Sequence, residues 1–439
     1  MTCRALSVRA TKDTDRLPVD FGEFVRHRGG SGVPVVQPRM GFSDPARMRA
    51  GLVATRRADA MSVGTITVDS YTRVGDSDAL KAALRDDACL NGYPIADHPA
   101  DTTRRVLSGV LGPDFPVQVR HGSANPDRIV RALIALRLNA TEGGPVSYCL
   151  PYGRTPLAES VGNWTRACEE FTGLLDLGIE PHLETFGGCM MGQLCPPGQL
   201  VAISVLEALF FAQHGLRSLS LSYAQQTSAE QDREAVAALR RLSSELLPTD
   251  NWHVVVYAYM GLFPQTPHGA RRLLATAAEL AAGTGAERLI VKTADEAHGI
   301  PTIAENVSAL EGAARAAALH HSDGGRGPTP PDTGIYDEAR ALVHAVLNLD
   351  DDIGVALVTA FRCGYLDIPY CIHPDNLGRT RSHIDAEGRL RWTDSGSLPL
   401  PRRVKAGPGR RITSSGLLAD LSYVRRKFDA TPAPAPGDE

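Results

Sequence analysis

Three arginines each close a short apolar run that resembles a β-strand: Arg39 in VVQPRMGF, Arg73 in TVDSYTR and Arg120 in VQVRHG. A guanidinium group binds carboxylates through paired, charge-assisted hydrogen bonds. In a β/α barrel the carboxyl ends of all strands open on one face, so the three side chains could converge there. A single arginine after a strand more often marks only the exit to solvent. Three together indicate a small, strongly anionic ligand.

A carboxylate and two phenols come from one short segment, EGGPVSYCLPYGR, as Glu142, Tyr148 and Tyr152. A glutamate beside a bound amino acid could accept hydrogen bonds from the ammonium group or exchange its proton. The alternative is a turn whose tyrosines pack in the core with their hydroxyls satisfied locally, and composition alone favours it. The glycines do not indicate a phosphate loop, because neither GxGxxG nor GxxxxGK is present.

Two more segments carry charged residues near expected strand ends. In LIVKTADEAHGIPT, Lys292 ends an apolar run and Glu296 is expected near the first turn of the next helix. The two would suit a hydroxylated ligand such as a ribose, although a surface ion pair explains them equally well. In HLETFGGCMMGQLCPP, Glu184 precedes a Gly/Cys/Met loop. That loop would admit a flat, bulky ligand or simply make a tight connection.

No metal site is expected. His98 and His121 have no second ligand at metal spacing, which favours structural histidines, and none of the eight cysteines forms a CxxC pair. The formal net charge of -4 and the scattered basic residues exclude nucleic acid and anionic membranes as expected partners. The sequence shows neither a long apolar span nor a signal peptide, so we expect a cytoplasmic protein.

The elements that must position these residues alternate between short apolar strands and amphipathic helices, which is typical of a parallel sheet covered by helices. Helical spacing recurs in Ile129, Ala132, Leu133 and Leu136, and again from Leu273 to Ala281. Nine strand ends compete for eight places in a barrel, and we assign the one at Asn91 to a loop. Strands are expected at residues 33–37, 65–68, 116–119, 219–222, 253–257 and 289–291, with less regular ones ending at Glu142 and Glu184.

The sequence therefore predicts an α/β protein built on an eight-stranded β/α (TIM) barrel with extensions at both ends. The Gly/Pro-rich run HHSDGGRGPTPPDTG separates the barrel from a smaller region expected to pack on it. The tail TPAPAPGDE is expected to be disordered. The expected boundaries are 1–28 for the N-terminal extension, 29–320 for the barrel, 321–334 for the loop, 335–428 for the C-terminal region and 429–439 for the tail.

Together these segments resemble the catalytic subunit of glutamate mutase, also called methylaspartate mutase. The blocks that carry the resemblance are QPRMG, DSYTR, LNGYP, QVRHG, EGGPVSYCLPY, YMGLFPQ, VKTADEAHGIPT and DIP…DNLG, in the family's order and near its spacing. They cover roughly residues 30 to 400. The resemblance implies a barrel capped by adenosylcobalamin, radical rearrangement of glutamate to 3-methylaspartate, and site residues at matching positions.

The roles that the resemblance implies are these. Arg39, Arg73 and Arg120 bind the substrate carboxylates, with His121 nearby. Glu142 and Tyr148 are catalytic residues beside the amino group, and Tyr152 also contacts the substrate. The cofactor contacts are Gly41, Arg73, Asn91, Glu184, Met260, Lys292 and Glu296.

The cobalamin-binding motif of such enzymes, DxHxxG, is absent from this sequence. The resemblance therefore implies a separate, small cobalamin-binding subunit, and self-association of this chain into a dimer within a heterotetramer. Three departures from the family pattern, Met191, Arg154 and Tyr257, keep the substrate open, so a mutase for another acidic amino acid is an alternative. Met191 and Tyr257 also motivate a silent paralogue that binds the cobalamin subunit. A separate alternative, a barrel hydrolase using Glu142 and Glu184 as paired carboxylates, leaves the three arginines unexplained.

Overall fold

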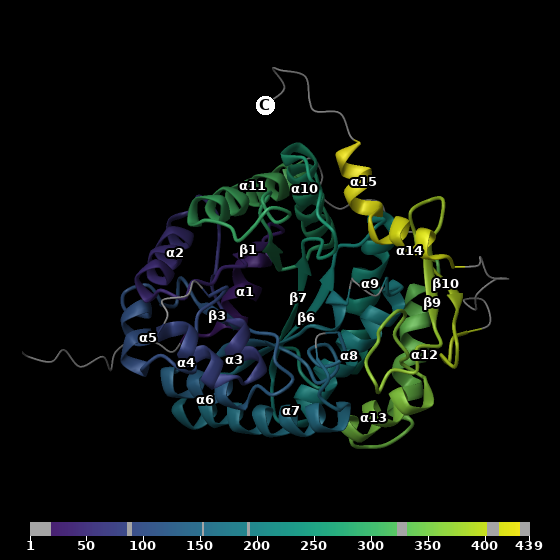
Figure 1. The fold of residues 1–439 in the computed structure, drawn as a ribbon, viewed down its shortest axis with the longest axis horizontal. Helices are drawn as coiled ribbons and strands as arrows, with labels where there is room; N and C mark the ends of the chain where they lie inside the picture. Colours follow the sequence, from purple (N-terminus) through teal and green to yellow (C-terminus); the bar gives the residue numbers. More distant parts are fainter. Residues whose placement is uncertain are drawn as a thin grey trace, which may run out of the picture.

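Eight parallel strands form a sheet that closes on itself, with helices around the outside (Figure 1). This computed structural model describes residues 19–85, 90–151, 153–190, 194–322, 332–401 and 412–430. The strand order is β1-β8-β7-β6-β5-β4-β3-β2. A bridge between Val36 and Ser62 closes the ring, with the N–H of Val36 donating to the carbonyl of Met61 at 2.9 Å. The predicted eight-stranded β/α barrel is therefore confirmed.

Every strand expected from the sequence is present, with its ends displaced by no more than two residues. Asn91 lies in the loop before α5, as expected, where Val68 and Tyr93 make only an isolated bridge. The strands are β1 (Val35–Pro38), β2 (Gly64–Thr67), β3 (Val117–Arg120), β4 (Ala140–Gly143), β5 (His182–Thr185), β6 (Ser218–Ala224), β7 (Trp252–Tyr257) and β8 (Arg288–Val291).

Amphipathic helices connect the strands and turn their apolar faces to the sheet. The helical spacing found in the sequence corresponds to α6 and α10. The helices are α1 (Phe21–Gly29), α2 (Pro45–Arg57), α3 (Ser70–Val74), α4 (Ser77–Arg85), α5 (Ala100–Leu107), α6 (Asp127–Leu136), α7 (Leu157–Thr172), α8 (Pro197–Gln213), α9 (Ala229–Leu246), α10 (Pro267–Thr284) and α11 (Ile303–Ser322).

Helix α8 differs from the others because it is apolar on every side and buried from Pro197 to Phe211. A helix with this pattern must be enclosed. Helices α12 (Ile335–Leu347) and α13 (Ile353–Cys363) enclose it on the outside of the barrel, as Figure 1 shows. A hairpin of β9 (Arg381–Ile384) and β10 (Leu390–Asp394) lies beyond them.

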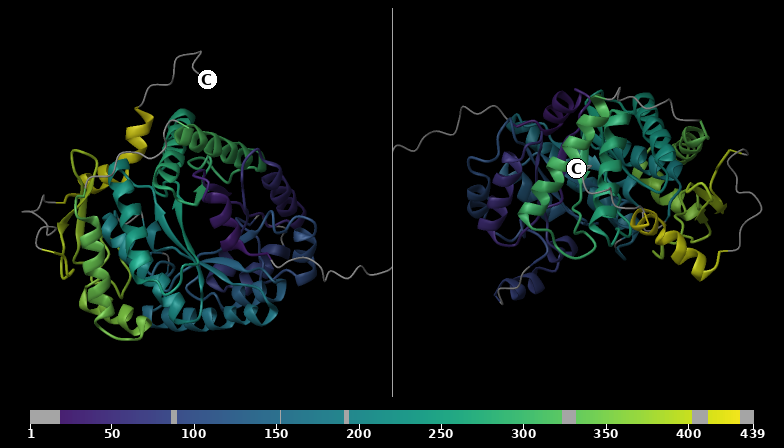
Figure 2. Two further views of the ribbon diagram at one scale, coloured as in Figure 1. Left: turned by 180° about the vertical axis from the view of Figure 1, so that it is seen from behind. Right: turned by 90° about the horizontal axis from the view of Figure 1, so that it is seen from above.

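Helix α1 lies beneath the amino ends of the strands and appears inside the ring of helices in Figure 2. Its Gly22 fits there because a Cβ atom would lie 2.3 Å from Oγ of Ser218, at the start of β6. The ring of Phe21 packs 5.2 Å from that of His182 and 5.0 Å from the guanidinium carbon of Arg288. The helix thus closes the amino end of the barrel and leaves the carboxyl end open.

The last described helices, α14 (Ser414–Leu421) and α15 (Tyr423–Asp429), return to the barrel beside α10. The carboxylate of Asp429 accepts hydrogen bonds from the backbone N–H of Gln265 at 3.1 Å and of Thr266 at 2.9 Å. The hydroxyl of Thr266 also donates to it at 2.7 Å. Helix α15 therefore anchors the loop between β7 and α10, and it extends one residue into the segment expected as the tail.

No helix within the described residues is both long and apolar enough to cross a membrane.

Candidate active site

A cavity of about 140 Å³ opens at the carboxyl ends of β1 to β4. A larger one, about 520 Å³, lies at the other end of the barrel beside α1. Active sites of β/α barrels form at the carboxyl ends of the strands, so the smaller cavity is the candidate. Its lining residues are Arg39, Thr67, Val68, Arg73, Arg120, His121, Gly122, Glu142, Tyr148, Phe186 and Met260.

The three arginines expected to converge do so, because all of them line this cavity. Arg39 follows β1 and Arg120 ends β3, as predicted. Arg73 was expected at a strand end, but β2 ends at Thr67 and Arg73 lies on the short helix α3. Its side chain returns to the cavity across Gly122, where a Cβ atom would lie 2.7 Å from Cδ of Arg73. A larger residue at that position would force the Arg73 side chain to move.

Arg120 and Glu142 form a buried ion pair at the floor of the cavity. Nε of Arg120 donates to Oε2 of Glu142 at 2.7 Å, and the two side chains are 5% and 1% exposed. The hydroxyl of Tyr148 donates to the other oxygen, Oε1. Burial lowers the pKa of Arg120, but the Glu142 carboxylate raises it further, so the net pKa is well above the ordinary value. The guanidinium is therefore a permanent cation.

His121 faces the same cavity as a neutral hydrogen-bond donor. Burial, with the adjacent positive charge of Arg120, lowers its pKa to about 3. Nδ1 accepts a hydrogen bond from the N–H of Ser123 at 3.2 Å, which assigns the ring proton to Nε2. Nε2 is buried without a partner among the described residues. The ring stacks on Trp164 at 5.8 Å, so its orientation is fixed.

A second charged group lies at the rim of the cavity. Lys292 follows β8, and its Nζ lies 2.8 Å from Oε1 of Glu296, which also lies 3.4 Å from Nη1 of Arg39. Burial lowers the pKa of Lys292 to about 8, with Arg39 acting in the same direction and Glu296 against it. Glu296 was expected near the first turn of a helix. That prediction is wrong, because α11 begins at Ile303 and Glu296 lies in the preceding loop.

Only some of the remaining predicted residues line the cavity. Met260 lines it, whereas Asn91 and Glu184 do not. Asn91 accepts a hydrogen bond from the N–H of Ser70 at 3.1 Å, beside the start of α3. Tyr152 lies outside the described residues. Gly41 packs against the end of β2, where a Cβ atom would lie 2.4 Å from the carbonyl oxygen of Thr67.

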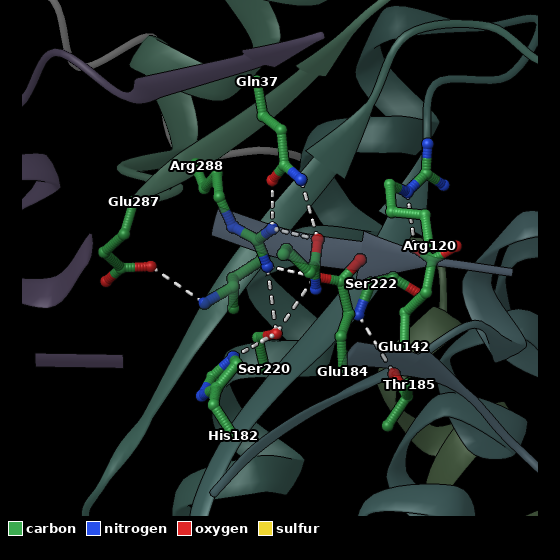
Figure 3. Close-up of polar contacts among 12 residues, drawn as sticks. Gln37, Arg120, Glu142, His182, Glu184, Thr185, Ser220, Ser222, Glu287 and Arg288 are labelled. Atoms are coloured by element: carbon green, nitrogen blue, oxygen red, sulfur yellow. Dashed lines mark hydrogen bonds and ion pairs between the residues drawn. The ribbon is translucent and has the colours of Figure 1, made fainter. Parts of the chain in front are cut away.

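Beneath the cavity, polar side chains fill the barrel interior, as Figure 3 shows. Glu184 and Arg288 form an ion pair there, and neither side chain is exposed. Arg288 also donates to Gln118 and to Ser220, each at 3.1 Å, and to Gln37. The sequence interpretation did not identify this layer. Its signal is a polar residue in each of several buried strands, including the arginine that opens RLIVK.

Tyr257, noted in the sequence only as a departure from a family pattern, connects this layer to the cavity floor. Its hydroxyl lies 2.8 Å from Oε2 of Glu142 and also contacts Oε1 of Glu184. Nη2 of Arg120 donates to the same phenol oxygen at 3.4 Å. The phenol of Tyr257 therefore bridges Glu142 and Glu184, the two carboxylates named above as a possible catalytic pair.

Glu207, which was not predicted from the sequence, supports the turn that follows β4. Its carboxylate accepts hydrogen bonds from the N–H of Ser147 at 2.8 Å and of Val146 at 3.2 Å, and from the Ser147 hydroxyl at 3.0 Å. Burial raises the pKa of Glu207 to about 7, although the hydrogen bonds from Ser147 lower it. The sequence signal is a single charge in the apolar run LVAISVLEALFFA.

A family model for the methylaspartate mutase E chain matches residues 19–420. The chain belongs to the methylaspartate mutase E chain family. Glutamate mutase epsilon subunits are among its relatives. That of Yersinia enterocolitica is 29% identical over 397 residues, covering 85% of this chain and 80% of the relative. That of Haloarcula marismortui is 29% identical over 417 residues, covering 90% and 84%. That of Halobacterium salinarum is 31% identical over 352 residues, covering 77% and 72%.

Membership of the methylaspartate mutase E chain family makes the chain an isomerase of the mutase type. The matched range includes every predicted site residue. A solved structure of an aldolase from Escherichia coli K12 aligns with 71% of this chain and all of that chain, at 12% identity and a TM-score of 0.35. This structural similarity is too weak to support the fold assignment, which rests on the order of the strands. Of the three departures, Tyr257 is buried, Arg154 is exposed and Met191 lies outside the described residues.

Proposed function

We propose that this chain is the catalytic subunit of an adenosylcobalamin-dependent mutase that interconverts L-glutamate and 3-methylaspartate. The observation that carries the proposal is the cavity at the barrel mouth, where three arginines and the carboxylate of Glu142 face a volume of about 140 Å³. Family membership and the names of the relatives support it. A ligand with two carboxylates and one ammonium group matches this set of charges.

The arginines would bind the two carboxylates of the amino acid. Arg73 is exposed, with its stem resting on Gly122, and its guanidinium is available to a ligand. Arg120 is held in place by Glu142, so it presents a fixed cation. A fixed guanidinium binds a carboxylate with less loss of side-chain entropy than a mobile one. The fixed positions of the guanidinium groups, and not only their charge, would therefore favour a ligand with two suitably spaced carboxylates.

The carboxylate of Glu142 would accept the ammonium group of the ligand. It already accepts hydrogen bonds from Arg120 and from the Tyr148 hydroxyl, which orient both of its oxygens. His121 adds a neutral donor through Nε2. A buried donor without a partner costs free energy, and a ligand acceptor placed there would recover it. Glu142 and Tyr148 remain our proposed catalytic residues.

The rim of the cavity suits the adenosyl part of the cofactor. Lys292 and Glu296 offer a donor and an acceptor for ribose hydroxyls. The hydroxyls of Thr67 and Thr293 are buried there without partners among the described residues, so polar ligand atoms would satisfy them. When bound, the cofactor supplies the radical that abstracts hydrogen from the substrate. The chain itself contributes orientation and exclusion of water.

The cobalamin would come largely from a second, smaller subunit. This sequence contains no DxHxxG motif, and the relatives are named as epsilon subunits, which supports a partner chain. The open carboxyl end of the barrel is the face to which such a subunit would bring the cofactor. We further propose that the chain self-associates into a dimer within a heterotetramer.

The test is an electron-spin measurement on the chain mixed with a DxHxxG subunit and adenosylcobalamin. Addition of L-glutamate should give a radical signal. Replacing Arg73 or Arg120 by methionine should abolish it, because an unpaired carboxylate costs roughly 2 to 5 kcal/mol of binding. Arg362→Met, which changes an exposed arginine on α13 that does not line the cavity, is the matched control. Signals retained in both cavity variants would refute the site.

A silent paralogue is the second candidate, because Tyr257 holds Glu142 in a network that a ligand must share. A complex that forms without any signal from L-glutamate or another acidic amino acid would favour this candidate. A signal with another acidic amino acid alone would change the substrate and keep the mutase.

A further inference from the structure

The phenol oxygen of Tyr257 lies between two buried carboxylates. It is 2.8 Å from Oε2 of Glu142 and in hydrogen-bond contact with Oε1 of Glu184. Nη2 of Arg120 donates to the same oxygen at 3.4 Å. Tyr257 and Glu184 are fully buried and Glu142 is 1% exposed. Solvent therefore has little access to the bridge, and its protons must be accounted for within it.

A phenol has one proton to donate and two lone pairs that accept, whereas an ionised carboxylate only accepts. If Glu142 and Glu184 are both ionised, Tyr257 donates to one of them and sets a lone pair against the other. That arrangement is costly where water cannot separate the two oxygens. A second proton, on either carboxyl group, makes both contacts into hydrogen bonds and leaves one phenol lone pair for Arg120.

The second proton changes the net charge of this layer. Glu142 is paired with Arg120, and Glu184 is paired with Arg288. When the phenol proton is the only proton in the bridge, the two carboxylates and the two guanidinium groups cancel in charge. The second proton gives the layer a net charge of one positive unit. Donors also reach the outer oxygens, from Tyr148 to Glu142 and from Gln118 and Ser220 to Glu184. A net positive charge under the cavity would favour an anionic ligand above it.

We propose that Tyr257 joins Glu142 and Glu184 into one acid–base unit, which takes up and returns a proton on behalf of Glu142. The catalytic part of this inference rests on the proposed function, because the proton in question is that of an amino acid's ammonium group. Tyr257 is not among the residues that line the cavity and acts through Glu142. It is therefore a positioning residue.

The transfer balances without any redox partner. As the ammonium group binds, the second proton of the ligand-free bridge leaves to solvent through Glu142, which lines the cavity, so both carboxylates are ionised when the transfer begins. An N–H bond of the ammonium group breaks as an O–H bond forms on Glu142. The O–H bond on Oε2 of Glu142 then breaks as one forms on the phenol oxygen of Tyr257, whose own proton moves to Oε1 of Glu184. The ligand becomes a neutral amine, Glu142 is again a carboxylate, and Glu184 is a neutral acid. The reverse sequence returns the proton before the product leaves.

The proton count can be measured in the full-length chain without any ligand. The infrared C=O stretch of protonated carboxyl groups, identified by its shift in D₂O, should lose a component in Tyr257→Phe. Glu184→Gln should lose the same component, because its amide group can donate to the phenol oxygen without a second acid proton. Tyr93→Phe is the matched control. It removes another buried hydroxyl, which lies 2.8 Å from the hydroxyl oxygen of Thr103 rather than beside a carboxylate. That variant should keep the component.

An unchanged spectrum in folded Tyr257→Phe would overturn the inference. If that variant does not fold, an unchanged spectrum in Glu184→Gln would do the same. The role of the bridge in proton transfer is tested by calorimetric titration of L-glutamate into the chain in two buffers of different ionisation enthalpy. The wild type should release the second proton of the bridge to the buffer when glutamate binds, and Tyr257→Phe, which lacks that proton, should not. An infrared component that disappears as expected, without glutamate binding, would contradict the proposed substrate and leave the shared proton standing.

Discussion

Nε of Arg120 and Oε2 of Glu142 are 2.7 Å apart at the adjacent ends of β3 and β4, and both side chains are nearly inaccessible to solvent. Removing one charge would leave the other buried and unpaired. We predict that Glu142→Gln lowers the free energy of unfolding in urea by about 3 to 5 kcal/mol. The control is Glu170→Gln, which breaks an exposed pair with Arg131 at 2.9 Å and should change stability little. Equal losses in both variants would contradict the cost assigned to burial.

Stability should depend on pH through three buried carboxyl groups. Burial raises the pKa of Glu207, Asp232 and Glu338 to about 7 each. The folded chain therefore binds these protons more tightly than the unfolded chain. The resulting stabilisation is complete below the unfolded pKa values and is lost as pH rises through about 7. Each group contributes at most roughly 3 to 4 kcal/mol. Urea unfolding should show a more stable protein at pH 5.5 than at pH 8.

Glu338→Gln separates one of these groups from the rest. Nε1 of Trp392 donates to Oε1 of Glu338 at 2.9 Å, and an amide oxygen can accept the same bond. This variant should lose part of the pH dependence while remaining folded at pH 8. A wild-type chain that is equally stable at both pH values would show that these carboxyl groups titrate normally.

The barrel could be predicted from the sequence because each of its strands and helices is marked by a pattern within a short segment. Runs such as HVVVY mark strands, and repeated apolar residues at helical spacing mark helices such as α10. The convergence of Arg39 and Arg120 also followed, because every strand end in a barrel points to the same face. These predictions needed the order of elements and no knowledge of which side chains touch.

The interior network could not be predicted in the same way. Glu184 and Arg288 are 104 residues apart in the chain, and Tyr257 and Glu142 are 115 apart. Their contacts depend on how the barrel closes and on the register of its strands. Arg73 was placed at a strand end because TVDSYTR continues an apolar run, but Asp69 caps a helix there by accepting from the N–H of Tyr71 and of Thr72. Local hydrogen bonding ended the strand early.

The turn that carries Tyr148 should depend on Glu207. Glu207→Ala leaves the buried N–H groups of Val146 and Ser147 without their acceptor, at a cost of about 1 to 3 kcal/mol for each. Stability should fall, and the affinity for L-glutamate should fall with it because the turn no longer fixes the phenol. Glu207→Gln keeps one acceptor oxygen and should be affected less. Unfolding curves and calorimetry measure the two effects separately, and unchanged glutamate binding in Glu207→Ala would show that the turn holds without it.

Helix α15 should control the mobility of the loop that carries Met260. In Asp429→Ala the N–H groups of Gln265 and Thr266 lose their acceptor. Hydrogen exchange in residues 260–269 should then become faster, because local opening costs less. Asp394→Ala, on the β9–β10 hairpin, is the control and should leave exchange in that loop unchanged. Equal protection in both variants would mean that α15 does not anchor the loop.

The central claim is that this cavity rearranges an acidic amino acid. The most direct measurement is proton NMR of L-glutamate incubated, without oxygen, with the chain, a DxHxxG cobalamin subunit and adenosylcobalamin. We predict the appearance of the methyl doublet of 3-methylaspartate, and its absence when Arg73→Met replaces the wild type. A stable complex of the two subunits that leaves L-glutamate unchanged would contradict the account.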